Sequence, residues 1–123
     1  MAKILIVDDE IDVVDLVTYL LERAGHQVRQ ARNGKDGLEL VRKETPDLIV
    51  LDIMMPEMDG YTLNQHLLAD AQARQIPVVV LTARVGLQAK SALAPNIRAH
   101  VEKPFDPIDL KKCIDKILNG PTP

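Results

Sequence analysis

Three unbroken apolar stretches of strand length constrain the fold of this chain more than any other feature of its sequence. They read "KILIVD" at 3–8, "DLIVLD" at 47–52 and "PVVVLT" at 77–82. A strand that is apolar at successive positions is buried on both of its faces, as in a parallel sheet covered by helices on both sides. The three stretches therefore predict the central strands of one parallel sheet.

Segments with helical periodicity separate these strands. Apolar residues recur at helical spacing from Ile11 to Ala24, and Gly25 follows as a stop signal. By the same patterns we expect further helices over 35–44, 61–73, within 85–93 and over 106–118, and outer strands over 26–31 and 98–103. Five alternations of strand and helix predict an α/β fold. Its sheet is doubly wound, parallel and five-stranded in the order 2-1-3-4-5, with helices on both faces.

Composition narrows the functional class. A chain of 123 residues is one domain by length, and we assign it to residues 1–120, with 121–123 as a tail or the start of a linker. The net charge of −3 and the scarcity of aromatic residues argue against nucleic-acid binding. The single cysteine, Cys113, fits a reducing compartment. No apolar stretch reaches the roughly 20 residues of a membrane span, so we expect a cytoplasmic domain.

Polar residues close the predicted strands. Asp8 and Asp9 end the first strand, Asp52 the third, Thr82 the fourth and Lys103 the fifth. Carboxyl ends of parallel strands share one edge of the sheet, and ligands bind at that edge where the winding direction reverses. We therefore expect one crevice to collect these side chains.

Their chemistry suits a metal-assisted phosphoryl reaction. Neighbouring carboxylates resist joint ionisation, and a hard cation such as Mg²⁺, or Mn²⁺ in its place, relieves that repulsion through oxygen ligands. Asp52 would then act as a nucleophile toward phosphorus. Lys103 and the Thr82 hydroxyl would stabilise the phosphoryl oxygens.

Each residue also has a simpler interpretation. Asp8 and Asp9 could cap the following helix, and Asp52 could form a turn. Thr82 could be an ordinary strand end, and Lys103 a solvated charge. All four interpretations would have to hold together at one edge of one sheet, which makes the common site the better hypothesis.

Several motifs resemble the receiver domain of two-component response regulators, which has a flavodoxin-like fold. They are "ILIVDDE", "DLIVLDIMMPEMDG", "VVVLTA" and "KPF", in the family's order and at its intervals. The resemblance extends from Lys3 to about Leu118. It implies a signalling module whose only catalysis is its own phosphorylation and dephosphorylation.

The resemblance also implies particular roles. Asp52 would be the phosphoacceptor, taking its phosphoryl group from a phosphohistidine on a histidine kinase or histidine phosphotransfer protein. Asp9 would bind Mg²⁺ directly, Asp8 mostly through water, and Met54 through its backbone carbonyl oxygen. Glu10 would either add to the acidic cluster or cap the helix.

Further roles follow for the other motif residues. Thr82 and Lys103 would bind the phosphoryl group as switch residues, with a cis bond between Lys103 and Pro104. Pro56 and Gly60 would shape the loop after the acceptor.

One departure from the family concerns the output of the switch. Position 100, usually aromatic in the family, is His100 here, and the fourth helix within 85–93 looks short. We expect His100 to report the state of Asp52 on the surface formed by helix four, strand five and helix five, where a downstream protein target would bind. An exposed histidine without a role is the alternative.

Three other functions compete. A phosphatase of the haloacid dehalogenase type would need an aspartate where Met54 stands. A flavin-binding flavodoxin would need a phosphate loop in place of "VDDEIDV". A receiver-like interaction module that works without phosphorylation would not need the acidic residues, Thr82 and Lys103 together.

Overall fold

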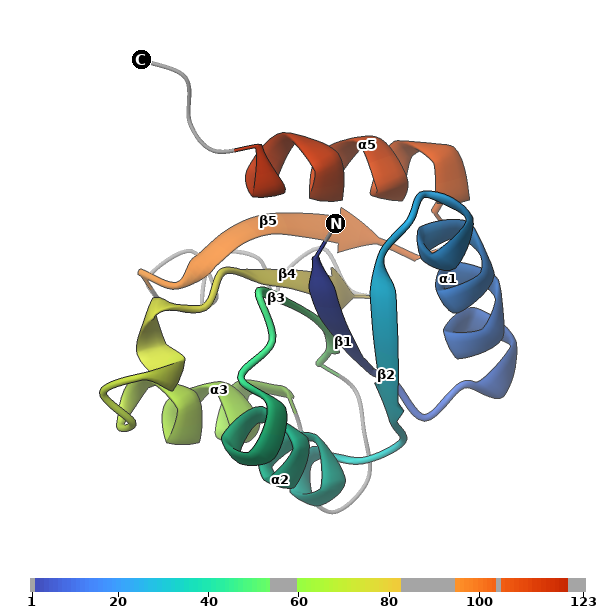
Figure 1. Ribbon diagram of the computed structural model, residues 1–123. Coiled ribbons are helices and arrows are strands. Elements are labelled where there is room, and N and C mark those ends of the chain that lie inside the picture. The colour runs from blue at the N-terminus through green and yellow to red at the C-terminus, as the bar shows by residue number, and fades with distance from the viewer. Residues whose placement is uncertain (1, 54–59, 83–94, 104, 120–123) are drawn as a thin grey trace.

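The computed structural model describes residues 2–53, 60–82, 95–103 and 105–119, which form a sheet between two layers of helices (Figure 1). The elements follow in the order β1 (Lys3–Val7), α1 (Ile11–Arg23), β2 (Gln27–Ala31), α2 (Gly34–Glu44), β3 (Leu48–Asp52), α3 (Gly60–Leu68), the 3-10 helix η1 (Ala73–Gln75), β4 (Val78–Thr82), β5 (Ile97–Glu102) and α5 (Pro107–Leu118). In these ranges, no helix is both long enough and apolar enough to cross a membrane.

The sheet confirms the predicted fold class. Its strands lie in the order β2-β1-β3-β4-β5, and every neighbouring pair is parallel. Helices α1 and α5 cover one face, and α2 and α3 cover the other (Figure 1). The helix expected within 85–93 falls outside the described residues.

Two apolar cores explain why the central strands are apolar at every position. Successive strand residues point to opposite faces, so each strand contributes alternately to the two cores. The core beneath α2 and α3 takes one set, namely Leu5, Val7, Ile49, Leu51, Val78 and Val80. The core beneath α1 and α5 takes the other, namely Ile4, Ile6, Leu48, Val50, Val79 and Leu81.

Helix α3 is shorter than its sequence pattern predicts. The expected helix over 61–73 ends at Leu68, so the prediction is wrong for its last turn. The Asp70 carboxylate accepts hydrogen bonds from the backbone N–H groups of Gln72 and Ala73 at 2.9 and 3.1 Å. Aspartate competes with helical hydrogen bonding in this way, and the chain turns into η1 instead.

A β-bulge sets the orientation of β5. Val78 pairs with Ile97 but Val79 pairs with Ala99, so β5 carries one extra residue at this point. Bulges of this kind reverse which residues face each side of the sheet. As a result, His100 lies on the same face as Val78, beside the core under α2 and α3.

Gly60 packs directly against the end of β3. A Cβ atom at this position would lie 2.6 Å from the backbone oxygen of Asp52 and 2.7 Å from the Cα atom of Ile53. The Gly60 N–H also donates to the Ile53 carbonyl oxygen at 2.9 Å. Only glycine fits so close to the backbone of the strand that ends in Asp52.

We therefore expect Gly60→Ala to destabilise the fold by roughly 2 kcal/mol or more, because backbone atoms cannot yield as side chains do. Gly37→Ala is the matched control, since its added methyl would meet only the Val7 and Leu63 side chains, at 3.0 Å and beyond. Urea unfolding measures both free energies. A loss for Gly60→Ala no larger than that for Gly37→Ala would contradict this account.

Candidate functional site

Four charged side chains meet at the carboxyl edge of the sheet, and we call them the strand-end cluster. Asp8 follows β1, Asp52 ends β3, Lys103 follows β5, and Glu10 precedes α1. Asp8 is 0% exposed and Asp52 is 2% exposed. The structure thus brings together three residues that the sequence placed in one crevice, Asp8, Asp52 and Lys103.

The Lys103 ammonium group joins the cluster. Its Nζ atom lies 2.9 Å from Asp8 Oδ2, 2.6 Å from Glu10 Oε1 and 3.4 Å from Asp52 Oδ2. Burial acts to lower the pKa of Lys103, but hydrogen bonds to Glu10 and Asp8 and the charge of Asp52 outweigh it and hold that pKa above its usual value. The ammonium therefore stays charged and offsets the cost of burying two carboxylates.

Asp8 serves both the cluster and the start of α1. Its Oδ1 atom accepts a hydrogen bond from the Glu10 N–H at 2.9 Å, while its Oδ2 atom accepts from Lys103. The N-cap residue of α1 is Glu10, so Asp8 orders the turn before the helix and does not cap it as the simpler interpretation expected. These contacts fix the carboxylate in one orientation.

Glu10 belongs to the cluster, whereas the family resemblance pointed to Asp9 as the direct metal ligand. Carboxylate oxygens of Asp8, Glu10 and Asp52 lie within 4.8 Å of one another, whereas Asp9 is exposed and is not part of this group. Glu10 is the N-cap residue of α1, yet its side chain makes no capping hydrogen bond. The feature of the sequence that could have indicated this role is the position of Glu10, two residues after Asp8 at the end of β1.

The donor set fits a hard divalent cation. Mg²⁺ and Mn²⁺ prefer oxygen ligands, and the three carboxylates place their oxygens within 4.8 Å of one another. Several predicted site features fall outside the described residues: Met54, Pro56, Pro104 and the Thr82 side chain. The backbone of Thr82 ends β4, at the same edge as the cluster.

His100 lies on β5, paired with Val80 on β4. Its Nε2 atom is buried and has no hydrogen-bond partner among the residues that the structure describes. Burial lowers the pKa of the imidazole below its ordinary value of 6.5. The side chain is therefore half-buried in the protein rather than a freely exposed histidine, although its predicted switch role stays a prediction.

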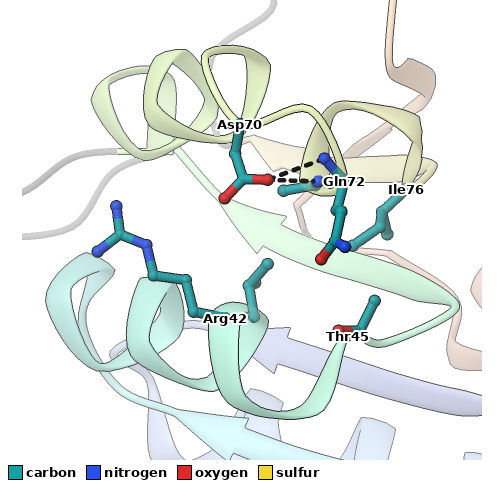
Figure 2. Close-up of a pocket in the computed structure, with 7 residues that line it drawn as sticks. Arg42, Thr45, Asp70, Gln72 and Ile76 are labelled. Atoms are coloured by element: carbon teal, nitrogen blue, oxygen red, sulfur yellow. Dashed lines mark hydrogen bonds between the residues drawn. The ribbon is translucent and has the colours of Figure 1, made fainter.

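Figure 2 shows a hollow that shares no lining residue with the strand-end cluster. It measures about 230 Å³ and is lined by Val41, Arg42, Thr45, Asp70, Gln72, Ala73 and Ile76. These residues end α2 and precede β3 and β4, so the hollow lies at the amino edge of the sheet. Asp70 is engaged within its own turn there, and those backbone hydrogen bonds lower its pKa (Figure 2).

Comparison with known proteins places the chain in a family. Residues 4–115 match the family described as the response regulator receiver domain. The chain belongs to this receiver family. This membership confirms the resemblance seen in the motifs and sets aside the haloacid dehalogenase and flavodoxin alternatives.

Relatives of this receiver domain differ in length. It is 39% identical over 121 residues to the protein PilH of Pseudomonas aeruginosa, covering 98% of this chain and 100% of PilH. It is 42% identical over 107 residues to the DNA-binding dual master transcriptional regulator RpaA of Synechocystis, covering 86% of this chain but 44% of RpaA. The chain thus spans all of one relative and less than half of the other.

Solved structures share the fold of this receiver domain. The chemotaxis response regulator CheY4 of Vibrio cholerae superposes with a TM-score of 0.87 at 30% identity, covering 95% of this chain and 98% of that one. A response regulator from Chloroflexus aurantiacus gives 0.86 at 32% identity, covering 96% and 98%. Receiver domains are signalling modules that work with histidine kinases and downstream targets, and this chain has their architecture.

The buried imidazole gives a pH prediction. Because the folded pKa of His100 is lowered, its contribution to stability is complete above about pH 6.5, the unfolded value, and is lost as the pH falls through the folded pKa. His100→Gln should therefore lose less stability between about pH 7 and pH 5 than the wild type. Urea unfolding at both pH values measures this difference.

His66→Gln is the matched control, because it makes the same substitution at an exposed position on α3. A His100→Gln variant with the same pH slope as the wild type would show that this imidazole titrates as it does in the unfolded chain.

Proposed function

We propose that this receiver domain takes a phosphoryl group onto Asp52 from a phosphohistidine on a histidine kinase or histidine phosphotransfer protein. The observation that carries the proposal is the Asp52 carboxylate itself. It is 2% exposed at the end of a central strand, with the Lys103 ammonium 3.4 Å away. A buried carboxylate beside a fixed cation can act as a nucleophile, because the cation offsets the negative charge of the phosphorylated product.

The reaction transfers one phosphoryl group. An Asp52 oxygen forms a bond to phosphorus, the bond from phosphorus to the donor imidazole nitrogen breaks, and the electron pair leaves with the imidazole. Lys103 would donate a hydrogen bond to a phosphoryl oxygen, and the Thr82 hydroxyl would donate another. Water later attacks the phosphorus and restores the Asp52 carboxylate, so the domain acts only on its own phosphoryl group.

Mg²⁺, or Mn²⁺ in its place, would be held by Asp8, Asp9, Asp52 and the Met54 backbone carbonyl. When bound, the ion would offset negative charge on the transferring phosphoryl group. The close approach of carboxylate oxygens from Asp8 and Asp52 supports this assignment. Asp9 is exposed beside them, within one residue of the buried Asp8, and its role as a direct ligand belongs to the proposal.

Phosphorylation would act by shifting the balance between two existing conformations. Thr82 would turn toward the phosphoryl group, and His100 would respond from β5. The output surface would be the one formed by helix four, β5 and α5, where a downstream protein would bind. This proposal is supported by the partly buried His100 ring, whose Nε2 atom has no hydrogen-bond partner within the described part of the chain.

A module that works without phosphorylation is the alternative function. Such a module would have no need to keep the Asp52 carboxylate buried beside Lys103, at a cost in desolvation. The domain assignment, residues 1–120 with 121–123 as a tail or linker, belongs to the same proposal. The chain matches the whole length of PilH and less than half of RpaA.

Mass spectrometry of the intact protein tests the chemistry. After incubation with acetyl phosphate and Mg²⁺, we expect one added phosphoryl group, because the proposal assigns a single acceptor, Asp52. Asp52→Asn should abolish the added mass, since an amide cannot form the acyl phosphate. Omitting Mg²⁺ should reduce it strongly. Labelling of Asp52→Asn at the wild-type rate would remove Asp52 from its proposed role.

Thermal melting tests the metal. Magnesium at roughly millimolar concentration should raise the melting temperature, because the ion binds carboxylates that are gathered only in the folded state. Asp9→Ala should abolish the rise. Asp12→Asn is the control, since Asp12 is an exposed acidic residue in the first turn of α1 and should keep the wild-type response. An unchanged response in Asp9→Ala would place the ion elsewhere.

A further inference from the structure

Carboxylates surround the Lys103 ammonium group, and two of them, Asp8 and Glu10, accept hydrogen bonds from it. A lysine ammonium carries three N–H donors, and carboxylate oxygens of Asp8, Glu10 and Asp52 lie 2.9, 2.6 and 3.4 Å from its nitrogen. The Lys103 side chain is 13% exposed, so water has little access to it. A phosphoryl oxygen that is to accept a hydrogen bond from Lys103 must therefore compete with carboxylates already beside it.

Of the three carboxylates, Glu10 is the one that can leave. Asp8 is 0% exposed and is fixed through its other oxygen by the Glu10 N–H. Asp52 would itself carry the phosphoryl group. The Glu10 side chain is 58% exposed, and it makes no capping hydrogen bond to the helix that it precedes. Turning it into solvent would leave Lys103 paired with Asp8 and Asp52.

We propose that Glu10 is a positioning residue that occupies Lys103 in the unphosphorylated protein and is displaced by the phosphoryl group. This inference rests on the proposed function and adds a residue to it. Two effects act in the same direction. The Glu10 carboxylate competes with the phosphoryl group for a Lys103 donor. Its negative charge also repels the negatively charged phosphoryl group on Asp52.

Glu10 therefore lowers the affinity of the site for a phosphoryl group. It also holds the lysine in place before the group arrives, at 2.6 Å from Nζ. After hydrolysis the carboxylate would return to Lys103. A direct ligand role for Glu10 predicts the opposite effect, because removing a ligand would weaken the site.

Binding of beryllofluoride, a phosphoryl mimic, tests the inference in the full chain. Titration calorimetry at magnesium concentrations that saturate each variant would give the dissociation constants of wild type, Glu10→Ala and Glu10→Gln. We expect Glu10→Ala to bind about three- to tenfold more tightly, the scale of a partly exposed ion pair. Glu10→Gln should fall between, because its amide oxygen can still accept from Lys103 but carries no charge.

Asp12→Asn is the matched control. It removes one exposed negative charge two residues along the chain, on the first turn of α1. If general charge were the cause, Asp12→Asn would tighten binding as much as Glu10→Ala, which would overturn the inference. We expect it to stay within about twofold of the wild type, as for a screened surface charge.

A second readout uses no metal and no mimic. The NMR signal of the Lys103 ammonium should show faster exchange of its protons with water in Glu10→Ala, because one of its acceptors is gone. Equal or weaker beryllofluoride binding by Glu10→Ala, with clear binding by the wild type, would overturn the inference and leave the proposed function standing. Absence of binding in every variant would overturn both.

Discussion

The contact of the Lys103 ammonium with two buried carboxylates is the interaction on which the rest of this structure depends. Asp8 and Asp52 are 0% and 2% exposed, and carboxylates so deeply buried are costly unless a cation pairs with them. Lys103 reaches them from the end of β5, 95 residues along the chain from Asp8. The cluster therefore forms only when β1, β3 and β5 are all in place, which ties the site to the complete fold.

The sheet explains why these distant residues meet. In the order β2-β1-β3-β4-β5, the winding reverses beside β1, and the carboxyl ends of β1 and β3 lie side by side. Two apolar cores hold the strands from opposite faces. Gly60 lets α3 begin against the backbone of Asp52 and Ile53. The apolar strand β3 can thus end in the charged residue Asp52 while that residue stays buried.

Much of this was predictable because it depends on periodicity and on chain order. The unbroken apolar runs predicted the central strands, and parallel topology then placed Asp8, Asp52 and Lys103 at one edge. The early end of α3 was not predictable from apolar spacing, because Asp70 redirects the backbone through local hydrogen bonds. Glu10 was underestimated, since its contact with Lys103 depends on side-chain reach across 93 residues of sequence. The orientation of His100 depends on a bulge that leaves no clear pattern in "NIRAHVE".

Locating the phosphoryl group within the chain tests the central claim most directly. Borohydride reduces an aspartyl phosphate to homoserine, and peptide mass spectrometry then identifies the position that carried it. After treatment with acetyl phosphate and Mg²⁺, this account predicts reduction at Asp52 alone, because Asp52 is the buried carboxylate at the end of β3 that the proposed function assigns as the acceptor. Reduction at Asp8, Asp9 or Glu10 in place of Asp52 would contradict it.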